Sequence, residues 1–193
     1  MKYLAIDIET THIYPGCGQI LEFAAIFEDT SNPLPLADIP KLEVIFNHNE
    51  IYGDPFAINM NSRLIEILAD PAKCPENVNF IQGPSEPQIF VRIFKQFLRD
   101  QFGNDHEQIV VAGKNVEGFD LKWVRHNFPT LAEVFHRRTL DPGSMYCRPD
   151  DDVPPNLKEC LKRAGLGGPT ELHAALGDAW DAVRLIRNAW NVN

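Results

Sequence analysis

The chain has 193 residues, of which 44% are hydrophobic and 23% are charged. This ordinary globular composition excludes a disordered chain, a collagen and a coiled coil, and the length predicts a single domain over residues 1–193. The net charge of −9 argues against passive binding of nucleic acid, which normally uses a basic surface. It leaves open an enzyme whose acidic residues hold metal ions.

The chain carries no sign of membrane insertion or secretion. No apolar run reaches the roughly 18 residues of a membrane span, and Asp7 follows the first apolar run too early for a signal-peptide core. We therefore expect a cytoplasmic protein without a membrane partner. No pair of the four cysteines has C-x-x-C spacing, so the sequence predicts no structural zinc site.

The N-terminal part predicts three strands. Residues 2–8, 19–28 and 42–46 are rich in strand formers, and a proline-rich loop over residues 30–40 separates the second from the third. Three strands joined by turns and loops indicate an antiparallel meander.

Helical periodicity follows the third predicted strand. Helices are expected over residues 60–68, 88–102, 118–127, 156–164 and 175–191, short strands over residues 109–113 and 138–140, and a proline-rich loop over residues 71–87. This order predicts an α/β layer with one mixed sheet.

Asp7 and Glu9 stand two residues apart on the first predicted strand. The strand period places both carboxylates on one face and Ile6 and Ile8 on the other. Adjacent carboxylates repel each other in a half-buried strand, and a divalent cation removes that cost. Polar residues at a solvent-facing strand end produce the same pattern, so this pair alone leaves metal binding open.

Asp120 and Asp178 lie on two of the predicted helices. Asp120 follows the buried strand 109–113, and α/β sheets place their sites at such strand ends, although the helix dipole also favours an acid at this position. His173 stands five residues before Asp178 and would not share its helix face. We therefore place His173 on the preceding loop; a histidine near the helix cap and an exposed helix acid are the alternative.

These residues belong to three segments, DIETT over residues 7–11, AGKNVEGFDLKWV over residues 112–124 and HAALGDA over residues 173–179. In this order they resemble the motifs of the DEDDh family of 3′-to-5′ exonucleases, which includes the proofreading subunit of bacterial replicases, oligoribonuclease and RNase T. Ala174 stands where the other subclass has tyrosine, which favours the histidine subclass. The resemblance implies an RNase H-like fold with a five-stranded mixed sheet, three antiparallel strands and then parallel strands, flanked by helices.

The resemblance also implies the chemistry. Asp7, Glu9, Asp120 and Asp178 would hold two Mg²⁺ or Mn²⁺ ions, and oxygen ligands suit these hard cations. Two such ions clamp the attacking and leaving oxygens of a phosphodiester, and His173 would act as the general base. The implied activity is hydrolysis at the 3′ ends of single-stranded DNA or RNA, with release of 5′-mononucleotides.

Substrate contacts are expected from residues within or next to these motifs, namely Thr10, Thr11, Ile13, Asn115 and Phe119. His12 departs from the family pattern, which has glycine there. Asn115 precedes Asp120 by five residues, as in oligoribonuclease, whereas Phe119 resembles the proofreaders. The choice between DNA and RNA depends on contacts to the 2′-hydroxyl that the sequence does not place, so it stays open, as does the preferred substrate length.

The sequence leaves two alternative functions open. One is a catalytically silent or partner-dependent nucleic-acid-binding module of the same fold, and another is an oligoribonuclease-like enzyme restricted to very short RNAs. The complete set of four carboxylates and one histidine speaks against the silent module. The sequence has no nucleophile-elbow pattern, which speaks against a hydrolase with a serine or cysteine nucleophile. The resemblance also leaves a homodimer open.

Overall fold

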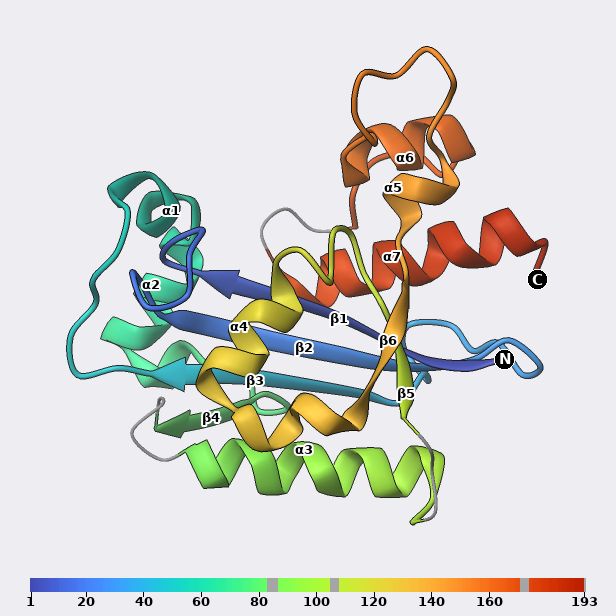
Figure 1. Ribbon diagram of the computed structural model, residues 1–193. Coiled ribbons are helices and arrows are strands. Elements are labelled where there is room, and N and C mark those ends of the chain that lie inside the picture. The colour runs from blue at the N-terminus through green and yellow to red at the C-terminus, as the bar shows by residue number, and fades with distance from the viewer. Residues whose placement is uncertain (83–86, 105–107, 171–173, 193) are drawn as a thin grey trace.

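The structure of the chain is a computed structural model that describes residues 1–82, 87–104, 108–170 and 174–192. Its strands form one sheet in the order β4-β3-β2-β1-β5-β6 (Figure 1). The strands are β1 (Lys2–Thr10), β2 (Ile20–Asp29), β3 (Lys41–Asn47), β4 (Asn79–Gln82), β5 (Ile109–Ala112) and β6 (Phe135–Leu140). The predicted α/β class and mixed sheet are confirmed.

Strands β1, β2 and β3 pair antiparallel, as the meander predicts, whereas β5 pairs parallel with both β1 and β6. The sheet has six strands rather than the expected five. The additional strand, β4, lies inside residues 71–87, which were expected as a loop, and it pairs parallel with β3. All four of its residues are half-buried, so it shows no alternation, and only its distant partner identifies it as a strand.

The helices partly follow the expected positions. They are α1 (Pro55–Met60), α2 (Ser62–Ala69), α3 (Pro87–Phe102), α4 (Asp120–Asn127), α5 (Pro142–Met145), α6 (Leu157–Ala164) and α7 (Ala175–Trp190), with 3-10 turns η1 (Pro71–Lys73) and η2 (Pro129–Val134). The helix expected over residues 60–68 corresponds to α2, and an unpredicted helix, α1, precedes it; Asp54 caps α1 by accepting the N–H of Phe56 at 2.7 Å. Among the described residues, no helix combines the length and hydropathy needed to cross a bilayer.

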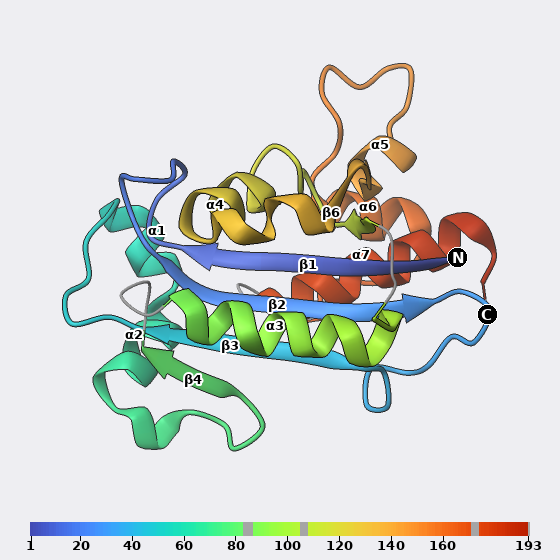
Figure 2. The same ribbon diagram turned by 60° about the horizontal axis from the view of Figure 1, so that its bottom comes forward.

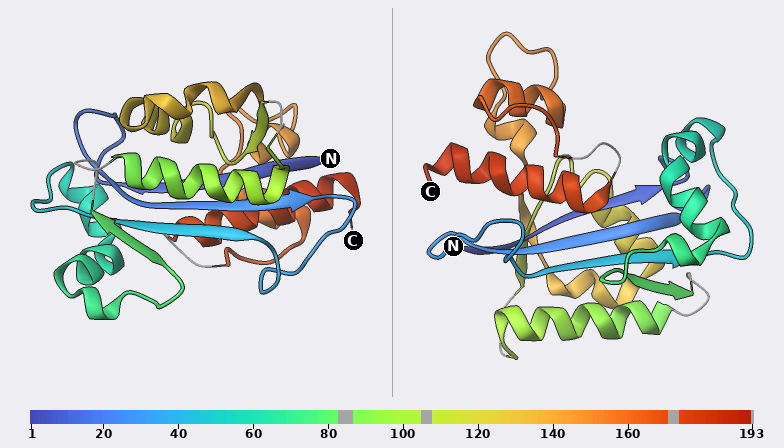
Figure 3. Two further views of the ribbon diagram at one scale, coloured as in Figure 1. Left: turned by 90° about the horizontal axis from the view of Figure 1, so that it is seen from below. Right: turned by 180° about the vertical axis from the view of Figure 1, so that it is seen from behind.

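The sheet lies between two helical layers (Figure 3). Leu4, Ile6 and Ile8 of β1 face a core shared with α3 and α4, and Figure 2 shows α3 lying along the strands. Tyr3 and Ala5 of β1 face the opposite side and pack with residues of α7. The alternation of β1 therefore assigns one face to α3 and α4 and the other to α7, and Asp7 and Glu9 follow Tyr3 and Ala5 onto the α7 face.

Candidate active site

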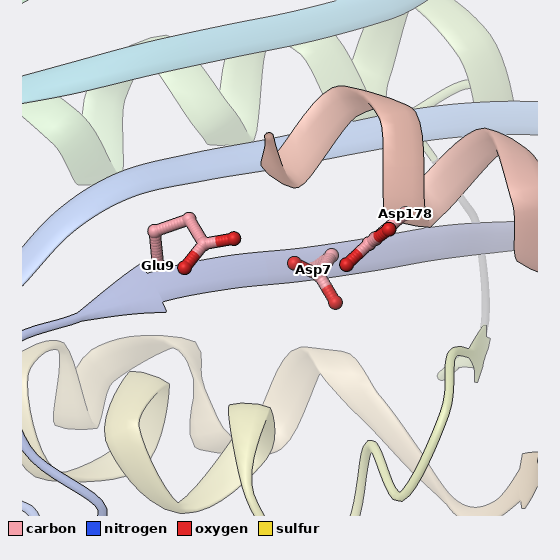
Figure 4. Close-up of side chains that lie close together, drawn as sticks. All are labelled: Asp7, Glu9 and Asp178. Carbon is pink, nitrogen blue, oxygen red and sulfur yellow. The ribbon is translucent and has the colours of Figure 1, made fainter. Parts of the chain in front are cut away.

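Three acidic side chains meet between β1 and α7. Asp7 and Glu9 lie on β1, Asp178 lies in the first turn of α7, and each offers one carboxylate oxygen such that the three oxygens lie within 4.8 Å of one another. Figure 4 shows Asp178 extending from α7 toward Asp7, with Glu9 farther along the same strand. We call these three residues the acidic cluster. The structure thus brings together three of the four predicted metal ligands.

Asp120 approaches β1 from the side of β5. It is only 2% exposed, and its Oδ1 accepts the backbone N–H of Ile8 at 3.1 Å. This N–H is available because β5 pairs with β1 only through Leu4 and Ala5, earlier in the strand. Asp120 therefore lies beside the acidic cluster without belonging to it, and its role as a metal ligand stays a prediction.

The environment raises the pKa of every one of these carboxyls. Burial, with the charges of Asp120 and Asp178, holds the pKa of Asp7 well above its usual range. Burial and the charge of Glu22 raise the pKa of Glu9 to about 7. Burial raises the pKa of Asp120 to about 8, and burial with the charge of Asp181 raises that of Asp178 to about 6.

These shifts test whether the residues suit a metal ion. Half-buried carboxylates that repel one another are costly when ionised, and a divalent cation between them offsets both the partial burial and the repulsion. The cluster offers only carboxylate oxygens, which are the ligands that Mg²⁺ and Mn²⁺ prefer. The donor set therefore fits the predicted ions.

His173, the predicted general base, lies outside the described residues. The described chain resumes at Ala174, the residue that precedes α7. The role of His173 stays a prediction.

The predicted substrate residues Thr10 and Thr11 have their hydroxyls engaged within the fold. The hydroxyl of Thr10 donates to the carbonyl oxygen of His12 at 2.8 Å. The hydroxyl of Thr11 donates to the carbonyl oxygen of Tyr52 at 2.7 Å and accepts the N–H of Gln19 at 2.8 Å. Both hydroxyls stabilise the chain after β1, and a substrate contact by either threonine stays a prediction.

The other predicted substrate residues differ in accessibility. Ile13 is 64% exposed. Phe119 is partly buried and packs against the core on the α4 face. Asn115 has a positive φ of 55°, and its N–H donates to Oδ2 of Asp141 at 3.1 Å. Of the three, Ile13 is the one that presents a large apolar surface to solvent, and the substrate roles of all three stay predictions.

Exposed apolar side chains gather after the end of β1. Tyr14 and Ile13 lie in the β1–β2 connection, Tyr52 precedes α1, and Phe56 lies in its first turn; their exposed fractions lie between 55% and 73%. Hydrogen bonds from the Thr11 hydroxyl to Tyr52 and from the Asp54 N–H to the Thr11 oxygen, both 2.7 Å, join the two segments. We call Ile13, Tyr14, Tyr52 and Phe56 the apolar rim.

Two residues near the cluster were missed in the sequence. Glu22 of β2 is fully buried and pairs with Arg63 of α2 at 2.8 Å. Its signal was a lone acid in the otherwise apolar run ILEFAAI. Asn61 is 3% exposed, donates to the carbonyl oxygens of Thr10 and Ala57 at 3.1 Å, and lowers the pKa of Glu9 by hydrogen bonding. No local pattern marks Asn61.

No protein-family model matches the chain, and no curated protein matches it in sequence. Solved exonuclease I structures do match. A moderately thermophilic exonuclease I from Methylocaldum szegediense is 19% identical with a TM-score of 0.65, and 96% of this chain covers 40% of that one. E. coli exonuclease I in complex with a 5cy-dT13 oligonucleotide is 18% identical with a TM-score of 0.62, at the same coverage.

A further exonuclease I structure is 17% identical with a TM-score of 0.67, and it covers all of this chain. At these identities the likeness concerns the fold, and it confirms the expected RNase H-like fold. The chain spans about two-fifths of the length of these exonuclease I chains, since the matches cover 40% to 41% of each of them.

Proposed function

We propose that the chain is a divalent-metal-dependent 3′–5′ exonuclease that releases 5′-mononucleotides from single-stranded DNA or RNA. The observation that carries the proposal is the acidic cluster, whose three oxygens lie within 4.8 Å of one another. The likeness in fold to exonuclease I supports it, because a solved exonuclease I structure matches the whole of this chain with a TM-score of 0.67. The DEDDh subtype, with His173 as general base, is part of the proposal.

The residues divide the work as follows. Asp7, Glu9 and Asp178 would hold one ion, and Asp7 together with Asp120 would hold a second. Two divalent ions held there would stabilise the charge on the attacking and leaving oxygens of a phosphodiester. His173 takes the proton from the attacking water, which a neutral imidazole does well near pH 7. The 3′ oxygen of the next nucleotide leaves, and a 5′-mononucleotide is released.

The apolar rim supports a single-stranded substrate. Unpaired bases can stack on aromatic and apolar side chains, whereas paired bases are already stacked within a duplex. Tyr52 and Phe56 are exposed and belong to a segment bonded to the end of β1, which carries the acidic cluster. A net charge of −9 disfavours a long duplex. Structures of E. coli exonuclease I with dT13 and dA16 oligonucleotides make DNA the first substrate to test.

The test is a time course on 5′-labelled single-stranded DNA and RNA of equal sequence, with Mg²⁺ or with EDTA. We expect a ladder that shortens from the 3′ end, that EDTA abolishes, and that Asp7→Asn slows more than about 100-fold, since even residues behind metal ligands typically contribute 10–100-fold. The matched control is Asp38→Asn, which changes an exposed acid in a loop remote from the cluster; it should retain full activity.

Two outcomes would replace the proposal. A folded protein that binds Mg²⁺ and leaves both strands intact would favour the silent binding module. Cleavage of RNA dinucleotides with no attack on longer strands would favour the oligoribonuclease-like enzyme.

A further inference from the structure

A single buried carboxylate joins three elements beside the acidic cluster. Glu22 of β2 is fully buried. Its two oxygens accept hydrogen bonds from Nη2 of Arg63 on α2 at 2.8 and 2.9 Å. Oε2 also accepts the backbone N–H of Ala175, the first residue of α7, at 2.9 Å. The side chain thereby links the second strand, the second helix and the last helix at one point.

The position of this link matters for the metal ligands. Glu22 lies directly opposite Glu9 in the β1–β2 register. Ala175 precedes Asp178 by less than one helical turn. The residue before α7 is Ala174, which has no side chain that can cap the helix, and Glu22 takes that place from another element. The hydrogen bond to Ala175 therefore fixes the end of α7 that carries Asp178 against the strand pair that carries Glu9.

We propose that Glu22, held in place by Arg63, is a positioning residue that sets where Asp178 stands relative to Asp7 and Glu9, and thereby the affinity of the cluster for a divalent cation. The inference rests on the proposed function of the cluster as a metal site. Metal ligands need placement within a fraction of an ångström, which the groups behind them supply.

A second ion pair shows what a purely structural link looks like. Glu28, also on β2 and fully buried, pairs with Arg187 of α7 at 2.9 and 2.6 Å. Arg187 lies near the C-terminal end of α7, and also bonds the carbonyl oxygen of Leu34. Glu22 and Glu28 are both buried glutamates that join β2 to α7, Glu22 through the Ala175 N–H and Glu28 through Arg187. Glu22 differs because it is bonded to the helix end that carries a cluster residue.

The test compares Arg63→Met with Arg187→Met in the full chain. The affinity for Mn²⁺ is measured by electron paramagnetic resonance titration, and the thermal midpoint is recorded for each variant. Arg63 is about one-third exposed, so its replacement leaves the core packed. We expect Arg63→Met to weaken Mn²⁺ binding about 10-fold or more. Arg187→Met should lower the thermal midpoint at least as much and leave Mn²⁺ affinity within about threefold.

The sign of the Arg63→Met effect separates positioning from simple electrostatics. Removing a positive charge near the cluster attracts a cation more strongly, so a role confined to charge predicts tighter binding. Release of Glu22 from its partner predicts weaker binding. Arg63→Lys retains the charge and one donor, and should restore part of the lost affinity.

Each result has one meaning. Equal or tighter Mn²⁺ binding by Arg63→Met overturns the positioning role and leaves the proposed function standing. Equal losses in both variants also overturn it, because they indicate a general loss of α7 packing. If the unaltered chain binds no Mn²⁺, the metal site itself fails, and the proposed function fails with it.

Discussion

The environment of Asp120 in the folded protein favours the protonated form of its carboxyl group. It is nearly inaccessible to solvent, and burial raises its pKa to about 8 despite the hydrogen bond from Ile8. A folded-state pKa above the unfolded value near 4 means that the folded state loses stability as pH rises through this range. Without metal, ionised Asp120 therefore opposes folding at pH 8.

Asp120→Asn should raise the free energy of unfolding of the metal-free protein at pH 8 by about 1–3 kcal/mol. The asparagine oxygen retains the hydrogen bond from Ile8, and the buried charge is gone. At pH 4, where Asp120 is already protonated, the gain should vanish. Urea unfolding in EDTA at the two pH values measures the difference, and a variant that is equally stabilised at both would contradict the buried-charge explanation.

Asp181→Asn is the matched control. Asp181 is also fully buried, but its carboxylate pairs with Arg184 at 2.8 Å, and its two oxygens accept hydrogen bonds from the backbone N–H and the hydroxyl of Thr170. The substitution removes the carboxylate charge that faces Arg184 and replaces one of the two acceptor oxygens by an amide group, so this variant should be destabilised at pH 8. A gain in stability for Asp120→Asn and a loss for Asp181→Asn would distinguish a buried carboxylate without a counter-charge from one that is paired with an arginine.

Individual residues also show how far sequence reasoning reaches. Asp7 and Glu9 were identifiable because alternation along one strand assigns both to one face. Glu22 was missed because its meaning depends on Arg63 and Ala175, which lie 41 and 153 residues away. Thr10 and Thr11 belong to the DIETT motif and were expected to contact substrate, yet their hydroxyls form hydrogen bonds with Gln19, His12 and Tyr52. A motif identifies which residues matter, whereas long-range packing assigns what each side chain does.

At the scale of elements, the segment before α1 is fitted closely to the end of β1. Gly53 has a φ of +148°, and a Cβ there would approach the backbone oxygen of Thr11 to 2.3 Å. Glycine is therefore required for this close approach. The contact fixes Tyr52 and Phe56 next to the strand that carries Asp7 and Glu9.

Phe56→Ala should weaken the binding of single-stranded DNA if the apolar rim stacks unpaired bases. Stacking of a base on an aromatic side chain contributes about 1–3 kcal/mol, so we expect KM to rise at least about fivefold with kcat nearly unchanged. Phe56 is 73% exposed, and its removal should leave the thermal midpoint unaltered.

Val153→Ala is the control, because Val153 is 72% exposed and lies outside the rim. Its KM should match that of the unaltered protein. An unchanged KM for Phe56→Ala would remove Phe56 from the substrate path.

The short elements were the ones that sequence reasoning missed. β4 has four half-buried residues, and its partner β3 lies about 35 residues earlier, so neither period nor length revealed it. α1 has six residues with no buried side chain, and its one local signal is the pair Asp54-Pro55. The long elements β1, α3 and α7 were found, because each buries a continuous face.

At the scale of the whole molecule, the acidic cluster lies on the strand at which the sheet changes from antiparallel to parallel pairing. β1 pairs antiparallel with β2 and parallel with β5, and open α/β sheets place sites at such strand ends. The resulting site lets protons and metal ions compete. The pKa of Glu9 is about 7 and that of Asp178 about 6, so the folded metal-free protein holds more protons than the unfolded chain between about pH 4 and 7.

Mg²⁺ should therefore stabilise the protein more at pH 8 than at pH 5.5. At about 100 times the dissociation constant, binding adds about 2.7 kcal/mol, which for a chain of this length raises the thermal midpoint by about 5–10 °C. At pH 5.5 protons occupy the carboxylates with raised pKa values, and the shift should fall by at least about half. Calorimetric unfolding with Mg²⁺ or EDTA at matched ionic strength measures both shifts. Asp7→Asn should abolish the Mg²⁺ effect, and an equal shift at both pH values would show that the ion binds elsewhere.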